Sequence, residues 1–183
     1  MAQTLITTAT ASSSASLAFT SSIDSTYKLY IFKFFDIHPA TDGVEFQWNG
    51  STDGGSSYSV DKTATFFRAQ ANEGDSAADL NYSGGDSKEP HVAIADTTYQ
   101  TLNYDVDNDN DSCCVGELYI FNPSSTTYVK HYYSVSQTML NAASSNHAFA
   151  AGYMNTASAI NAMSFKMSSG NIDTGTIKMY GVG

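Results

Sequence analysis

The residues best suited to chemistry in this sequence lie between positions 105 and 111. This stretch reads Asp-Val-Asp-Asn-Asp-Asn-Asp, so Asp105, Asp107, Asp109 and Asp111 put a carboxylate at every second position. Carboxylate and amide oxygens in a loop are the ligands that a calcium ion takes. The stretch lacks the glycine and the bidentate glutamate that an EF-hand loop requires, and the sequence predicts no flanking helices. We therefore expect either a calcium site of another type or a solvated turn.

The other polar residues do not form a catalytic pattern. The histidines contain no H-x-H or H-E-x-x-H pair, and G-x-S-x-G is absent from the sequence. The four histidines are His38, His91, His131 and His147. Glycoside hydrolysis uses two carboxylates, for which spacing alone selects no pair. The loose candidates are Glu45, Asp61, Glu73 and Glu117. We expect structural histidines and a protein that is not an enzyme.

The two cysteines, Cys113 and Cys114, are adjacent in the sequence. A disulfide between neighbours is strained, because its normal geometry needs Cα atoms roughly 4.4–6.8 Å apart. We predict two free thiols, one buried and one exposed, in a protein that folds in a reducing compartment.

Charge and hydropathy argue against several classes of partner. The 183 residues carry a net charge of −10, from 8 basic and 18 acidic side chains. An acidic chain repels phosphate backbones and anionic lipid, so we expect neither nucleic-acid nor membrane binding. The N-terminus lacks the basic and apolar regions of a signal peptide. No stretch approaches the ~18 apolar residues of a membrane helix.

The strand that dominates the sequence is 27–37, which is apolar on both faces and is therefore expected in the middle of a sheet. After a short turn, Val44, Phe46 and Trp48 alternate with polar residues, which indicates a half-buried strand. Further strands are predicted at 4–10, 17–19, 58–67, 91–102, 117–121, 127–135, 160–167 and 175–181. Residues 138–147 are the one candidate helical turn.

About ten short strands separated by Gly, Ser, Asn and Asp turns indicate an all-β fold. We predict a single domain over residues 1–183, an antiparallel β-sandwich of jelly-roll or concanavalin-like type. The first and last strands are expected to lie together, and a long polar loop is expected at 69–90.

The 13% of aromatic residues has two interpretations. Trp48 with Tyr58 or Tyr132 could form a platform that stacks on sugar rings. Alternatively, the aromatic rings fill the core and the interfaces between subunits, where they are also abundant.

Four segments together resemble a known class of proteins. They are IHPATDGVEFQW, STDGGSSY, LYIFNPSSTTYVKHY and MSSGNIDTGTIKMYGVG. From Tyr27 to its end, the chain resembles the small β-sandwich virion proteins of marine tailed bacteriophages, which serve as capsid decoration or fibre-associated subunits. The resemblance implies a jelly-roll or concanavalin-like fold and no catalytic residues.

Two functions follow as expectations. The first is a head decoration (cement) protein, made in the bacterial cytoplasm and located on the virion. Its partners would be the major capsid protein or other virion subunits, and it would form a homo-oligomer, for example a trimer. The alternative is a carbohydrate-binding or receptor-binding module of a tail fibre.

Overall fold

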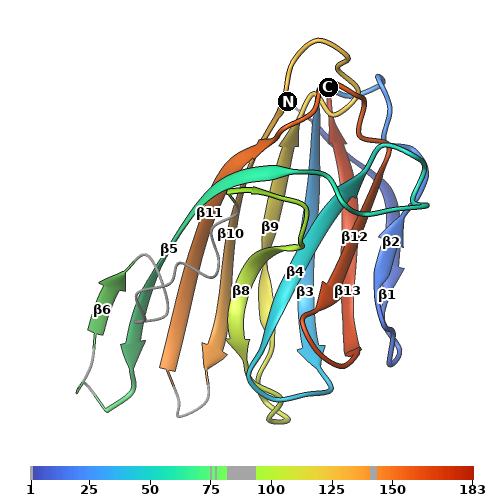
Figure 1. Ribbon diagram of the computed structural model, residues 1–183. Coiled ribbons are helices and arrows are strands. Elements are labelled where there is room, and N and C mark those ends of the chain that lie inside the picture. Colours follow the sequence, from blue (N-terminus) through green and yellow to red (C-terminus); the bar gives the residue numbers. More distant parts are fainter. Residues whose placement is uncertain (1, 75, 77, 82–93, 141–143) are drawn as a thin grey trace.

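The computed structural model describes residues 2–74, 76, 78–81, 94–140 and 144–183 (Figure 1). These residues form strands, turns and loops without any helix, and every strand pair among them is antiparallel. The predicted all-β antiparallel fold is therefore confirmed.

The strands form two layers. The large layer runs in the order β1 (Gln3–Thr10), β13 (Ile172–Val182), β3 (Leu29–Pro39), β9 (Cys114–Phe121), β10 (Lys130–Leu140), β11 (Ser144–Met154) and β5 (Lys62–Asn72), and β5 also pairs with β6 (Ala78–Asn81) and β7 (Ile94–Asp96). The small layer runs β8 (Gln100–Val106), β4 (Val44–Ser51), β12 (Ala162–Met167) and β2 (Leu17–Phe19). Between β8 and β10 the ladder holds one residue pair, Val106 with Leu140, where the layers meet at a corner.

The strand order is that of a jelly roll. The framework strands β1, β3, β9 and β13 lie in the large layer and β2, β4, β8 and β12 in the small one, and the chain changes layer at every step except from β4 to β8. The orders β1-β13-β3-β9 and β2-β12-β4-β8 correspond to two interlocked Greek keys. The first and last strands pair, as predicted. Strands β10, β11 and β5 are additional to this framework and extend the large sheet beyond β9.

Aromatic rings fill the space between the layers. Phe32 and Phe34 of β3 meet Phe46 of β4 and Phe165 of β12 at centroid separations of 5.2 to 6.2 Å. Trp48 is fully buried next to them, so the predicted inward face of this strand is confirmed. Burial of each such ring stabilises the fold by about 1.5–3 kcal/mol.

Strand β3 lies in the middle of the large sheet, between β13 and β9, as predicted. Phe32 points into the core, while Ile31 faces the opposite side of the sheet and is only 2% exposed. Ile31 pairs with Tyr119 and Tyr180 on the neighbouring strands. Phe35 on this outer side is 39% exposed. The expected cover over the second face of this strand is therefore incomplete among the described residues.

The inner side of the added strands carries a network of buried polar residues beside a small apolar cluster of Phe66, Ala148 and Ala150. Asn103 of β8 donates to Ser136 of β10 at 3.0 Å and accepts from Asn146 of β11 at 2.6 Å. Ser136 donates in turn to the carbonyl of Leu102 at 2.7 Å. All four residues are buried. Because buried polar groups are costly when unpaired, this network holds the added strands in one position against β8.

The helical turn predicted at 138–147 is wrong. Thr138 to Leu140 end β10, and Ser144 to His147 begin β11, in the same antiparallel ladder. The segment combines two alanines, which favour a helix, with Thr, Asn, Ser and His, which favour it less. The pairing with β5 and β9 decides it, because tertiary context overrides weak local propensity.

The predicted polar loop at 69–90 is also partly wrong. Residues 69–72 continue β5, and Ala78–Asn81 form β6, which pairs with β5. The remainder of that loop, from residue 82, lies outside the described residues. Within the stretch expected as an acidic loop, residues 104–106 belong to β8.

Candidate functional site

The acidic stretch does not bring its four aspartates together. Asp105 lies within β8, Asp107 is buried at 4% exposure, and Asp109 and Asp111 are exposed in the following loop. The backbone N–H of Asp109 donates to Asp107 at 3.1 Å. Burial raises the pKa of Asp107, and the nearby carboxylates of Asp109 and Asp42 add to this rise. Among the described residues, no three His, Cys, Asp or Glu side chains form a group that could hold a metal ion.

The histidines occupy separate places. The Nε2 atom of His38 lies 3.2 Å from a backbone oxygen of the acidic loop, and Nδ1 of His147 lies 3.2 Å from Oε1 of Gln137. His131 is exposed on β10, where its ring meets Tyr153. His91 lies outside the described residues. The described histidines therefore make local structural contacts.

The two thiols are free, and one is buried while the other is half-buried, close to the expectation. Burial raises the pKa of Cys114, and burial together with the carboxylate of Asp36 raises the pKa of Cys113. A raised pKa keeps a thiol protonated and weakens it as a nucleophile.

The carboxylates considered for glycoside hydrolysis have local partners. Glu45 accepts hydrogen bonds from Gln47 at 2.8 Å and Thr101 at 2.5 Å. Glu117 accepts from the hydroxyl of Tyr119 at 2.7 Å. The other two candidates precede and follow β5. These hydrogen bonds hold the side chains of Glu45 and Glu117 against neighbouring surface residues.

The sugar platform built on Trp48 is wrong. Trp48 is fully buried and packs edge-to-face on Tyr132, with ring centroids 4.7 Å apart. Tyr132 is itself 3% exposed. Neither ring presents a surface to a ligand, so their role is in the core.

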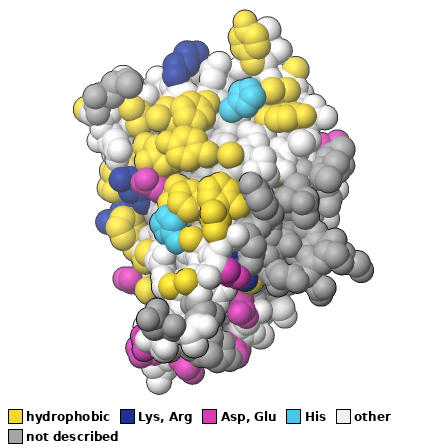
Figure 2. Space-filling view, turned by 90° about the vertical axis from the view of Figure 1, so that its left-hand side faces the viewer, with side chains coloured by type: hydrophobic (Ala, Val, Ile, Leu, Met, Phe, Trp, Pro, Cys, Tyr) yellow, Lys and Arg dark blue, Asp and Glu magenta, His cyan; other side chains and the backbone are white. Residues whose placement is uncertain are grey.

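The aromatic residues at the surface lie on the outer side of the added strands. Figure 2 shows apolar side chains gathered on this side of the molecule, with two histidines among them. We call this surface the aromatic face and define it by Phe67 of β5, Tyr119 and Phe121 of β9, Tyr133 and Val135 of β10, and Phe149 of β11. Its register is continuous, since Phe67 pairs with Phe149, Phe149 with Val135, and Tyr133 with Tyr119.

The rings of the aromatic face stand upright on the sheet. Phe67 and Phe149 stack with centroids 4.7 Å apart and planes 9° apart, and Tyr119 and Tyr133 stack at 4.5 Å and 15°. These separations match the roughly 4.7–4.9 Å between neighbouring strands. Each ring therefore turns one flat side toward its cross-strand neighbour. What the pairs offer outward is mainly ring edges.

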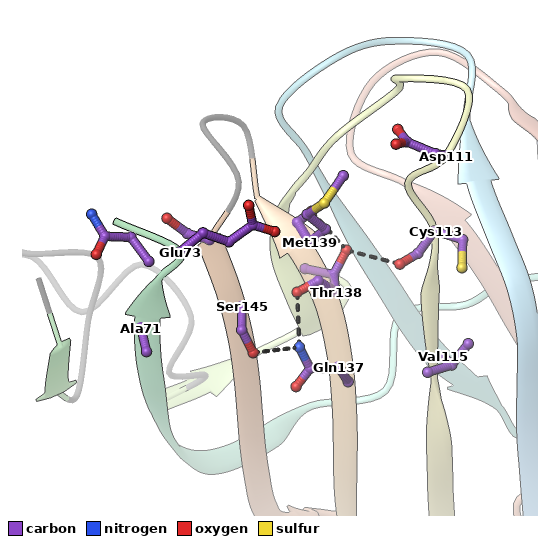
Figure 3. Close-up of a pocket in the computed structure, with 11 residues that line it drawn as sticks. Ala71, Glu73, Asp111, Cys113, Val115, Gln137, Thr138, Met139 and Ser145 are labelled. Atoms are coloured by element: carbon purple, nitrogen blue, oxygen red, sulfur yellow. Dashed lines mark hydrogen bonds between the residues drawn. The ribbon is translucent and has the colours of Figure 1, made fainter. Parts of the chain in front are cut away.

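Three hollows follow β10 across this surface. The largest, of about 560 Å³, lies at the turn end, and Figure 3 shows Glu73 and Asp111 on its opposite sides. On its floor, Gln137 donates to Ser145 at 2.9 Å. Two carboxylates and neutral hydrogen-bonding groups suit a neutral or cationic molecule better than an anion.

The other two hollows continue from the first. The middle one, of about 260 Å³, shares Gln137 with the largest hollow and Val135 with the third. The third, of about 160 Å³, lies between the two ring stacks, beside Tyr133 and over the small residues Ala151 and Thr65. We call this third hollow the notch. It has a mostly apolar lining and room for about one side chain.

Charges at the margin of the aromatic face are paired. Nζ of Lys33 lies 3.7 Å from Glu117 and 5.7 Å from the centre of the Tyr180 ring. Burial, and then the hydrogen bond to Glu117, raise the pKa of Tyr119. Lys178 lies over the ring of Phe35 at 5.1 Å. Outside the hollow with Glu73 and Asp111 at its turn end, the face is therefore nearly neutral in a chain that is strongly acidic overall.

Comparison with known proteins places the chain in no family: no family model, curated protein or solved structure matches it. Among the described residues, no helix is long and apolar enough to cross a membrane.

One pattern in the sequence does indicate the aromatic face. In β11, His147 and Phe149 alternate with the buried Ala148 and Ala150, a period of two with the large residues outside. This inverts the usual pattern of large residues inward. Because the inner residues of β11 are small, a search for large apolar residues on the buried side identifies neither this strand nor the aromatic face.

Proposed function

We propose that this chain is a non-enzymatic structural protein of a tailed phage virion, a decoration or cement protein on the outer surface of the head. The aromatic face is its contact surface with neighbouring subunits. Its partners are the major capsid protein or other virion subunits, including further copies of itself. It is made in the cytoplasm of the host bacterium and acts on the particle.

The observation that carries the proposal is the composition of the aromatic face. The solvent side of an antiparallel sheet is normally polar. Here Tyr133 is 40% exposed and Phe121 is 39% exposed, next to stacked rings on three neighbouring strands. Aromatic residues are enriched, and charged residues depleted, at the centre of protein interfaces. Contiguous exposed apolar patches of this kind mark interaction sites.

The framework beneath this face supports the same proposal. The face lies on the framework strand β9 and on the added strands β10, β11 and β5, and the hydrogen bonds of Asn103 hold β10 and β11 from behind. A surface held in one shape before binding loses less conformational entropy on association. That property suits a subunit in a regular shell.

Quantitative mass spectrometry of purified particles tests the proposal, using the phage whose genome encodes this chain. We expect the chain at high copy number relative to the tail proteins. Particles that lack the gene should regain the protein when it is added back in purified form. Absence from particles, or presence only at the copy number of a tail fibre, would overturn the decoration assignment.

A carbohydrate-binding module of a tail fibre is the second candidate. The hollow between Glu73 and Asp111 favours it, because its neutral amide and hydroxyl groups match the hydroxyls of an uncharged sugar. The upright rings argue against it, since pyranose rings stack on flat aromatic surfaces and not on edges. Binding to an array of neutral glycans that Gln137→Ala abolishes, with no change in melting temperature, would favour this candidate.

A further inference from the structure

We propose that the aromatic face packs against the same face of a second copy of this chain. In this two-fold dimer the strands of the two facing sheets run antiparallel. The inference rests on the proposed function, because it names the partner of the same surface. It also makes the dimer the unit that is added to the particle.

The size of the face fits a partner of this kind. The strands β3, β9, β10, β11 and β5 at about 4.8 Å each give a width of roughly 24 Å. Residues 133 to 139 of β10 give a length of roughly 23 Å at about 3.3 Å per residue. The footprint is then on the order of 550 Å². With the adjoining outer side of β3 included, two such footprints bury roughly 1,100 Å² in total, just above the roughly 1,000 Å² expected of a biological interface.

The charge of the face selects its partner. Two chains that each carry a net charge of −10 repel one another unless they meet through surfaces that lack this charge. The defining residues of the aromatic face carry no charge, and Glu117 beside Val135 is paired with Lys33. The carboxylates of Glu73 and Asp111 lie at the turn end of the surface, in the largest hollow. The face is therefore the surface on which a second acidic copy can approach.

The orientation follows from where the acidic residues gather. The turns and loop at one end of the sandwich are joined by hydrogen bonds from Ala40 to Asn171 and from Gly43 to Val106. Figure 2 shows acidic side chains at this lower end. Seven of the 18 acidic residues lie there: Asp36, Asp42, Asp105, Asp107, Asp109, Asp111 and Asp173.

A parallel arrangement would bring the two acidic ends together. In the antiparallel arrangement they are separated by the length of β10, whose 11 residues span roughly 35 Å. This is several times the Debye length of about 8 Å at physiological salt, so the repulsion is screened. Each acidic end then lies over the partner's opposite end. That end carries the exposed Lys28, whose backbone carbonyl accepts a hydrogen bond from the N–H of Asn122.

The notch supplies a specific contact within this dimer. Its floor, at Ala151 and Thr65, lies between the stacked pairs, so one apolar side chain of the partner can enter beside Tyr133. The two-fold axis repeats the contact twice. Well-packed pockets near the centre of an interface provide most of its binding energy.

A pair of matched variants tests the inference. Ala151→Arg fills the notch and adds a charge to the aromatic face, while Ala18→Arg makes the same change at an exposed strand position of the small sheet. Sedimentation equilibrium at pH 8 should give a dimer for the unmodified chain and for Ala18→Arg. Ala151→Arg should raise the dissociation constant by at least about tenfold, as expected for a central interface position. Thermal unfolding of both variants identifies any loss of folding.

Three results would overturn the inference. The first is a monomer at concentrations of about 100 μM, well above those at which specific complexes form. The second is an equal effect of the two substitutions on association. The third concerns orientation: between about 0.05 and 0.5 M NaCl the antiparallel dimer should change its dissociation constant less than about threefold, and a tightening by more than tenfold would place the acidic ends together.

The outcome is separable from that of the proposed function. A monomer present at high copy on particles would refute the dimer and leave the decoration assignment standing. A dimer absent from particles would do the reverse.

Discussion

Two buried tyrosines in the same core allow a direct test of how its polar groups are satisfied. Tyr132 is 3% exposed and Tyr30 is fully buried. Within the described structure, the hydroxyl of Tyr132 has no hydrogen-bond partner. The hydroxyl of Tyr30 accepts from the backbone N–H of Asp24 at 3.0 Å and donates to its carbonyl at 3.1 Å. Replacement by phenylalanine therefore removes a hydroxyl without a hydrogen bond at Tyr132 and a hydroxyl with two hydrogen bonds at Tyr30.

The expected changes in the free energy of unfolding have opposite signs. An unpaired buried polar group costs about 1–3 kcal/mol, so Tyr132→Phe should stabilise the protein by about 1–2 kcal/mol. Tyr30→Phe removes two hydrogen bonds, each worth about 0.5–1.5 kcal/mol, and should destabilise by about 1–2 kcal/mol. For a domain of this size, each kcal/mol moves the melting temperature by about 2–4 °C. The two variants should therefore differ by roughly 4–16 °C.

Urea unfolding and differential scanning calorimetry near pH 7 measure both variants. Burial raises the pKa of Tyr132 and of Tyr30, so both phenols stay protonated at this pH and ionisation does not complicate the comparison. A loss of more than about 1 kcal/mol in Tyr132→Phe, similar to that in Tyr30→Phe, would refute the reasoning. It would mean that a buried water or another group binds the Tyr132 hydroxyl.

Three further outcomes are expected. Trp48→Ala should lower the free energy of unfolding by about 3–5 kcal/mol, because it empties a fully buried site; an unchanged melting temperature would contradict its place in the core. Hydrogen bonds from Ser51 and Ser57 lower the pKa of Asp53 from 3.8 to about 2, so the stability that this carboxylate contributes is present above pH 4 and lost as the pH falls toward 2. Acid unfolding should therefore show a weaker pH dependence in Asp53→Asn, and identical profiles would contradict this. EDTA should move the melting temperature by less than about 2 °C, whereas a calcium site filled at a hundred times its dissociation constant would add about 2.7 kcal/mol.

Calcium binding would also have a structural consequence. Asp105, Asp107, Asp109 and Asp111 would have to rearrange, because Asp107 now turns inward while Asp109 and Asp111 point to solvent. A large stabilisation by calcium would thus be accompanied by a change in the chemical shifts of this loop.

The alternation of large and small side chains was sufficient to predict most of the jelly-roll framework. Val44, Phe46 and Trp48 alternate with polar residues, and all three are buried in β4. The two apolar faces of 27–37 placed that strand in mid-sheet, where β3 pairs on both sides. Alternation in the first strand and a continuous apolar run in the second are both local patterns that the sequence alone displays.

The added strands were harder to predict, because their inner side holds small and polar residues. Ser134, Ser136 and Asn146 are buried as deeply as the phenylalanines of the core, yet nothing local in their sequence marks them as inward-facing. Hydrogen bonds to β8 make the burial of Ser136 and Asn146 favourable, and those partners lie more than 30 residues away in the chain.

The amino-acid sequence by itself determined the fold class, the free state of the two thiols and the acidic charge of the chain. Tertiary structure decided which aromatic residues are inside and which are outside. Trp48 and Tyr132 are in the core, while Tyr133 and Phe149 lie on the outer side of the neighbouring strands β10 and β11. The physical reason is that a strand has two sides of equal geometry, and only the layer packed against it determines which side is buried.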